Sequence, residues 1–315
     1  MNYLPFLFYE QLAAQLEWGD LNKLFSKLVP STLTKVCRVH LENRQTISLR
    51  MLYTEGGQWM FSLFSSWKPG NRMLTDLTKY EYVDTIVVAN RVNPFYCPSP
   101  FEDNAFYWKD SLEKILRILP RYLRRAEFRW NDTRNNDEFN RKFCDVFLGS
   151  GLASTPFVEV RIPHVSNQGA EFLKRQVSFQ SLQKLQIGGT TPPAQWESSG
   201  SHIPDCIEEL LWQPQLKHFS ANYVCEVTPD IVRTLFLRWK SSKFSLDLYG
   251  NPTVAREVYK ELDQWSFDSD DWSYDEWEQE GRLCRSWDLS KRKSHAGKIR
   301  FMVGLGRITI KGVRK

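Results

Sequence analysis

The chain has 315 residues, 42% of them apolar and 14% aromatic, which is enough to bury a sizeable core and excludes a wholly disordered protein. No stretch approaches the roughly 18 continuous apolar residues that a membrane span needs, and the apolar N-terminus lacks the basic leader and cleavage pattern of a signal peptide. Six cysteines without regular spacing fit a reducing compartment. We therefore expect a protein of the cytoplasm or nucleus with no membrane partner.

The net charge of +5 conceals a separation of charges near the C-terminus. Residues 263–280 contain eight carboxylates and no lysine or arginine, whereas residues 282–315 contain eleven basic residues and one acidic residue. The net charge of residues 282–315 is therefore more positive than the net charge of the whole chain. Basic composition is therefore a weak indication of nucleic-acid binding here.

Apolar residues recur at helical spacing in the first 30 residues, beginning with Phe8, Leu12 and Leu16. Gly19 and Asp20 supply a stop and an N-cap, so this segment predicts two short helices.

Between residues 31 and 80 the pattern changes to short runs with alternating, β-branched or aromatic residues, at 36–41, 46–53 and 58–64. Turn residues separate these runs, which predicts a small antiparallel β meander.

From residue 81 to residue 265 strand-like runs alternate with amphipathic helical runs. We expect strands at 83–90, 126–130, 157–162, 184–188, 216–222 and 244–250. We expect helices at 109–123, 137–147, 170–179, 204–212, 229–239 and 253–265. A recurrence of roughly 20 to 35 residues with one strand and one helix is typical of a leucine-rich-repeat-like solenoid, because each unit buries its apolar face only against its neighbours. A doubly wound α/β domain also alternates strand and helix, but the irregular unit lengths favour the solenoid.

The C-terminal part contains an acidic run and then two alternating runs, 298–303 and 307–313, around Gly304 and Gly306. This pattern predicts a β-hairpin that caps the open end of the repeats. The predicted fold class is α/β: an irregular leucine-rich-repeat-like β-α solenoid with an N-terminal helical pair, a small antiparallel meander and a C-terminal hairpin cap.

No arrangement of residues indicates a chemical reaction. The paired glycines of the chain do not precede a helix, no serine lies in a G-x-S-x-G turn, and histidines are not spaced as zinc ligands. A calcium loop counted from Asp268 fails, because its sixth and twelfth positions are Ser273 and Gln279. We predict that the protein is not an enzyme and uses no cofactor or metal.

The acidic run has two interpretations. It is either a solvated linker whose charges offset the basic C-terminus, or a partner-binding loop in which Trp272, Tyr274 and Trp277 are exposed anchors.

The opening Leu4-Pro5-Phe6-Leu7-Phe8, followed by irregular β-α repeats and a short basic β tail, resembles F-box-like proteins with leucine-rich-repeat-type substrate regions, in particular the families expanded in roundworms. In such proteins the helical hook binds the Skp1 adaptor of a cullin ubiquitin ligase. The resemblance implies that Leu4, Pro5, Leu12 and Leu16 contact a Skp1-like adaptor.

The changes of pattern divide the chain into a helical segment at 1–30, which the resemblance makes F-box-like, the meander at 31–80, the repeat region at 81–265, and the acidic linker with the basic hairpin at 266–315. We predict a protein-protein recognition scaffold that holds a protein substrate on outward strand positions of the repeats. These positions are Arg129, Glu159, Arg161, Gln186, His218 and Asp247. The alternative is a nucleic-acid-associated protein that uses the basic C-terminal segment, and a salt-dependent affinity would indicate it.

Overall fold

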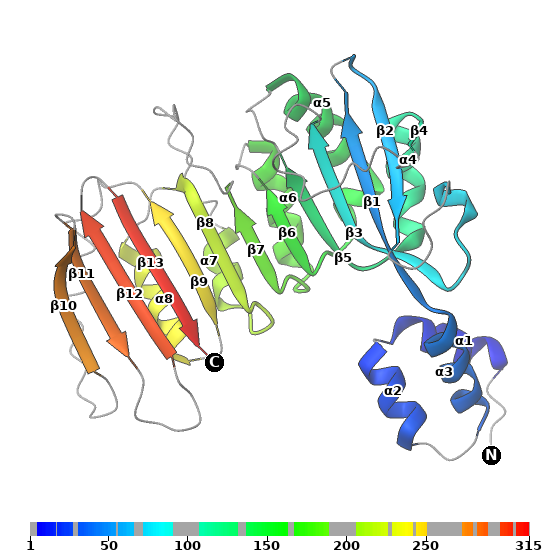
Figure 1. Ribbon diagram of the computed structural model, residues 1–315, viewed down its shortest axis with the longest axis horizontal. Helices are drawn as coiled ribbons and strands as arrows, with labels where there is room; N and C mark the ends of the chain where they lie inside the picture. Colours follow the sequence, from blue (N-terminus) through cyan, green and yellow to red (C-terminus); the bar gives the residue numbers. More distant parts are fainter. Residues whose placement is uncertain are drawn as a thin grey trace. The chain divides into compact units, whose positions relative to one another are not determined.

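The protein is a mixed α/β structure that divides into two compact units, Met1–Ala126 and Glu127–Lys315 (Figure 1). The computed structural model describes residues 5–16, 18–27, 31–54, 56–65, 72–90, 107–131, 137–162, 167–188, 206–225, 229–241, 244–250, 273–279, 282–288, 297–304 and 307–314. Each unit is described by itself.

The first unit begins with three helices, α1 (Phe6–Gln15), α2 (Trp18–Lys27) and α3 (Thr32–Asn43), and both α1 and α2 pack on α3. Their buried core is formed by one residue from α1, one from α2 and two from α3: Ala13, Leu21, Val36 and Cys37. The chain bends after α1, at Leu16.

Two expectations for this region were wrong. The strand predicted at 36–41 lies inside α3, because Ser31 caps this helix by accepting a hydrogen bond from the backbone N–H of Thr34. The break expected at Gly19 and Asp20 falls earlier, and both residues lie in the first turn of α2. The helical pair is therefore a group of three helices.

A mixed sheet completes the first unit. Strands β1 (Gln45–Tyr53) and β2 (Trp59–Phe64) form an antiparallel hairpin, and its turn uses Gly57 at φ +74°. Strand β3 (Glu81–Asn90) pairs in parallel with β1, and the short β4 (Trp108–Lys109) pairs with β2. Helix α4 (Leu112–Ile118) follows. Of the three runs predicted to form a meander, only those at 46–53 and 58–64 are strands, and they form the hairpin of β1 and β2.

The second unit repeats strand and helix along the chain. Its parallel strands are β5 (Leu123–Asn131), β6 (Glu159–Ile162), β7 (Lys184–Ile187), β8 (His218–Cys225) and β9 (Ser245–Gly250), each paired with the next. The helices between them are α5 (Asp137–Leu148), α6 (Asn167–Ser178), α7 (Cys206–Trp212) and α8 (Pro229–Ser241). The predicted alternation is confirmed from β5 to β9, and the helix predicted at 253–265 lies outside the described residues.

Four antiparallel strands extend this sheet beyond β9. They are β10 (Ser273–Gln279), β11 (Arg282–Asp288), β12 (Gly297–Gly304) and β13 (Arg307–Arg314). The predicted C-terminal hairpin is confirmed as β12 and β13, and β13 pairs with β9. Part of the predicted acidic linker is strand β10, which pairs with β11.

Helices α5–α8 cover one face of the β5–β9 sheet, and they lie behind these strands in Figure 1. The strand residues that point toward the helices are apolar and buried. They form two rows across the strands: Phe128, Val160, Leu185, Phe219 and Leu246, and then Ile162, Ile187, Ala221 and Leu248. Trp130, two residues after Phe128 on β5, is also buried.

Phe128 is the centre of an aromatic cluster at the start of this core. Its ring centroid lies 5.0 Å from that of Phe147 in α5, 5.4 Å from Phe157 and 5.6 Å from Phe172 in α6. These rings join a strand to two helices, so they hold the first repeats of the second unit together.

Replacing Phe128 with alanine should lower the free energy of unfolding of the second unit by about 3–5 kcal/mol, because the ring is fully buried and leaves a cavity. Urea unfolding followed by tryptophan fluorescence measures this change. The control is Phe179→Ala, where a 39% exposed ring is removed and a loss below about 1 kcal/mol is expected. Equal losses in the two variants would contradict the central position of Phe128.

Candidate functional site

The face of the β5–β9 sheet opposite the helices carries two rows of polar residues at paired register positions. The first row is Glu127, Glu159, Lys184, His218 and Ser245. The second row is Arg129, Arg161, Gln186, Ser220 and Asp247. Residues two apart on a strand point to the same side, so the ten residues share one face, which we call the polar face. Among the described elements of the second unit, none lies over this face (Figure 1).

All six strand positions that the sequence analysis placed outward lie on the polar face. Four further members were missed: Glu127, Lys184, Ser220 and Ser245. The period-two alternation around the apolar residues was the signal that could have found them. Binding of a partner by these residues stays a prediction.

Glu159 is the most deeply buried charged group of the polar face, with its side chain 5% exposed. Its Oε1 accepts a hydrogen bond from Nε of Arg161 at 2.6 Å, and its Oε2 accepts one from Nζ of Lys184 at 3.1 Å. Burial by itself would raise the pKa of Glu159, but these two hydrogen bonds hold the pKa below its usual value. Glu159 therefore stays ionised at neutral pH and links β6 to β7.

The polar face has no net charge at neutral pH. Its three cations are matched by three carboxylates, and Arg129 donates from Nη2 to Oε2 of Glu127. His218 is neutral because burial lowers its pKa, and the positive charge of Lys184 lowers it further. A face with balanced charges fits a mixed protein surface better than a run of phosphates.

Two of the three aromatic residues predicted as anchors in the acidic run are described, and neither lies on the polar face. Trp272 lies outside the described residues. Tyr274 and Trp277 belong to β10, where their register partners on β11 are Trp287 and Cys284. Strand β10 ends the order of the sheet, with β11, β12 and β13 between it and β9.

The adaptor-facing residues implied by the resemblance lie at α1. Pro5 is the exposed N-cap residue of α1, Leu12 is half-buried, and Leu16 packs against the core of the three helices. Leu4 lies outside the described residues. The three helices thus use Leu16 internally.

The sequence analysis missed the apolar residues that α1 exposes. Phe6, Leu7 and Phe8 are 58%, 66% and 44% exposed. The sequence pattern that predicts their exposure is a run of three adjacent apolar residues. Adjacent residues of a helix point in different directions, so a helix that packs on one side cannot bury all three. A cavity of about 410 Å³ also opens between α2 and α3, lined by Trp18, Asn22, Phe25, Arg38, Leu41 and Glu42.

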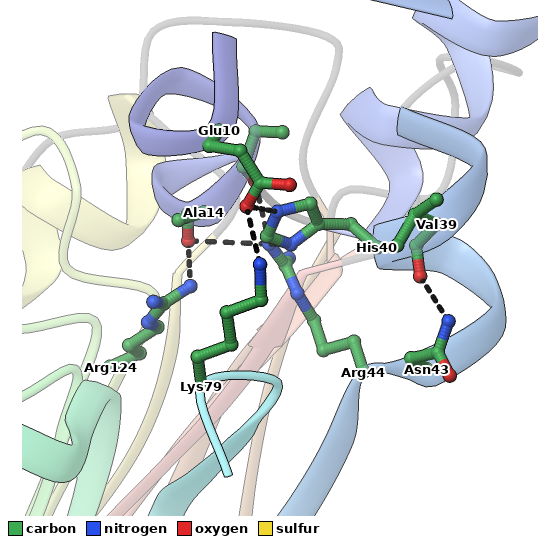
Figure 2. Close-up of polar contacts among 9 residues, drawn as sticks. Glu10, Ala14, Val39, His40, Asn43, Arg44, Lys79 and Arg124 are labelled. Atoms are coloured by element: carbon green, nitrogen blue, oxygen red, sulfur yellow. Dashed lines mark hydrogen bonds and ion pairs between the residues drawn. The ribbon is translucent and has the colours of Figure 1, made fainter. Parts of the chain in front are cut away.

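Two arginines hold the C-terminal end of α1 in the first unit (Figure 2). Arg44 donates to the carbonyl oxygens of Ala13 and Leu16, both at 2.6 Å, and Arg124 donates to that of Ala14. The carbonyl of Ala13 also accepts from the backbone N–H of Leu16 at 3.3 Å. Carbonyls in the last turn of a helix lack the usual partners of the helix interior, and a cation at this end is favoured by the helix dipole.

His40 lies beside this cap and is 2% exposed. Nη2 of Arg44 can only donate a hydrogen bond, so its partner at 3.4 Å, Nδ1 of His40, carries no proton. The proton of the neutral ring is therefore on Nε2, which donates to Oε2 of Glu10 at 3.3 Å. Figure 2 shows Glu10 between His40 and Lys79, whose Nζ is 3.4 Å from the same oxygen. Burial lowers the pKa of His40; the hydrogen bond to Glu10 opposes this effect, and Arg44 and Arg124 add to it.

The described part of the chain contains no group of three or more histidine, cysteine, aspartate or glutamate side chains that could hold a metal ion. Nor does it contain a helix with the length and apolar character required to cross a membrane. Comparison of the chain with protein-family models, curated proteins and solved structures finds no match.

The lowered pKa of His40 predicts a pH-dependent stability for α1 and α3. The unfolded chain binds a proton at a pKa of about 6.5, whereas folded His40 binds it only at lower pH. Stability is therefore complete above the unfolded pKa and falls as pH drops toward the folded pKa, by at most about 1.4 kcal/mol per pH unit. Hydrogen exchange of α1 and α3 peptides at pH 7.5 and 5.5, read by mass spectrometry, should show faster opening at the lower pH.

The variant His40→Gln should reduce this pH dependence in α1 and α3. His218→Gln, which removes a histidine with a lowered pKa from the second unit, is the matched control and should leave it unchanged. An unaltered pH response in His40→Gln would show that another group is responsible.

Proposed function

We propose that the protein is a non-enzymatic recognition protein that binds a protein partner on the polar face. The observation that carries this proposal is the one-sided covering of a parallel sheet. Parallel sheets are usually buried on both faces, whereas the described residues cover the β5–β9 sheet on one face and leave ten polar positions on the other.

A solenoid of leucine-rich-repeat type is the proposed architecture of this region. Helices on a single face support it, and so do buried polar side chains that join successive segments. Gln176 of α6 accepts from the backbone N–H of Phe157 at 2.9 Å and donates to the carbonyl of Thr155 at 3.0 Å. Gln213, after α7, donates to the carbonyl of Val177 in α6 at 2.9 Å. Each segment thereby satisfies backbone groups of a neighbour.

We further propose that the first unit attaches the protein to a Skp1-like adaptor of a cullin ubiquitin ligase. The grouping of α1, α2 and α3 with Pro5 at the start of α1 supports this proposal. The exposed Phe6, Leu7 and Phe8 supply apolar surface of the kind that marks protein interfaces. The polar face would then hold the substrate of the ligase.

Binding on the polar face is tested with peptides selected from a displayed random library on the full-length protein. The variant Gln186→Trp places a large side chain in the middle of the polar face and should weaken the selected peptides by about tenfold or more. Glu208→Trp adds the same side chain to an exposed position of α7 and should bind like the unmodified protein. Equal binding by both variants would remove the polar face as the binding site.

Adaptor binding is tested by affinity purification of the full-length protein from a roundworm lysate, with mass spectrometry of the Skp1-like adaptor and cullin subunits. The variant Leu7→Glu puts a charge on the most exposed apolar residue of α1 and should lose both proteins. The control Leu237→Glu, on α8 in the second unit, should retain them. Absence of both proteins from the unmodified sample would remove the ligase setting and leave the recognition face in place.

A further inference from the structure

We propose that Arg129 and Arg161 form a carboxylate-binding pair on the polar face, which selects a protein partner carrying an acidic side chain. This inference rests on the proposed function, because it names the chemistry that the polar face recognises. It concerns the β5 and β6 end of that face.

The two arginines are placed side by side by the sheet. Arg129 on β5 is the register partner of Arg161 on β6, and neighbouring strands are about 4.8 Å apart. Their side chains are 35% and 42% exposed. One carboxylate that approaches the face can therefore contact both guanidinium groups.

Each guanidinium is anchored by a carboxylate two residues earlier on its own strand. Glu127 binds Nη2 of Arg129, and Glu159 binds Nε and Nη2 of Arg161. These bonds use part of the five N–H donors of each arginine. The anchored groups are thus held in place, with donors left for a ligand, as a preorganised binding site requires.

The local charges leave room for one anion. Lys184 also binds Glu159, at 3.1 Å, so three cations surround two carboxylates at this end of the polar face. Both oxygens of Glu159 are already occupied. In addition, Nε of Arg129 is shielded from solvent and has no hydrogen-bond partner.

Stability alone does not explain this arrangement. Like charges at paired positions of neighbouring strands are destabilising, yet both rows begin with such a pair, Glu127 with Glu159 and Arg129 with Arg161. Partly exposed ion pairs return little stability. A row with two adjacent guanidinium groups is instead suited to bidentate recognition of a carboxylate.

A protein carboxylate fits better than nucleic acid. The site has a single excess positive charge, and Glu127, Glu159 and Asp247 lie on the same face. A nucleic-acid strand would bring successive phosphates next to these carboxylates, whereas one aspartate or glutamate of a partner meets only the arginine pair.

The test uses peptides selected on the full-length protein. We expect them to carry aspartate or glutamate at one fixed position, and replacement of that residue by its amide should weaken binding to the unmodified protein about tenfold. In Arg161→Gln the acidic and amide peptides should bind equally. Arg161→Lys keeps the charge but not the planar fork and should retain only part of the preference. Lys217→Gln, the matched control for loss of one positive charge, should retain all of it.

The outcomes separate the inference from the proposed function. Selected peptides without a fixed acidic position, or an undiminished preference in Arg161→Gln, would overturn the carboxylate pair while binding to the polar face stands. Insensitivity to Gln186→Trp would instead overturn the polar face itself. An oligo-deoxythymidine strand that binds the unmodified protein and is lost in Arg161→Gln would reassign the pair to phosphate and overturn the inference. Thermal unfolding of each variant checks that it remains folded.

Discussion

The parallel pairing of β5 to β9 is the constraint on which the second unit depends. Parallel neighbours need a crossover of a dozen or more residues, and the crossovers described here carry helices that pack on a single face of the sheet. Burial is therefore one-sided: Phe128 and Leu185 are fully covered, whereas the residues next to them on the strands are not. The open face must be compatible with water, so it carries charged residues, and their close spacing requires that they neutralise one another. Glu159 does this for Arg161 and Lys184.

The same topology partly buries the described segments that lead from a helix to the next strand, such as Phe157 and Leu216, and their backbone groups must find partners. Gln176 and Arg238 occupy equivalent places, since each reaches from a helix to the loop that precedes the strand before that helix. Gln176 bonds residues 155 and 157, and Arg238 donates to the carbonyls of Gln213 and Leu216 at 2.7 and 3.3 Å. In the first unit Arg44 meets the same need at the end of α1. Long polar side chains placed at buried backbone ends are thus a common device of both units.

Local patterns predicted the strands and helices from β5 to β9, and also which strand positions face outward, because alternation and helical spacing are properties of short segments. The run at 36–41 misled because Cys37, Val39 and Leu41 alternate with polar residues, as in a strand. Its buried residues, Val36, Cys37 and His40, instead share one side of a helix, and the cap at Ser31 decided for the helix. Contacts between distant segments were not predictable. Glu159 and Lys184 are 25 residues apart, and their ion pair exists only because β6 and β7 are neighbours. The exposure of Phe6 likewise depends on how α1 packs.

The division of each strand between a covered and an open side separates two kinds of sequence change. Along β7, for example, Leu185 and Ile187 determine whether the segment folds, while Lys184 and Gln186 determine what the surface presents. Exchanges at alternate positions can therefore change the open face one strand at a time without disturbing the interior. A lineage of such chains can vary the chemistry of this face while keeping a common framework, and Glu159 is the place where this freedom is most restricted, since it belongs to the polar face yet is buried.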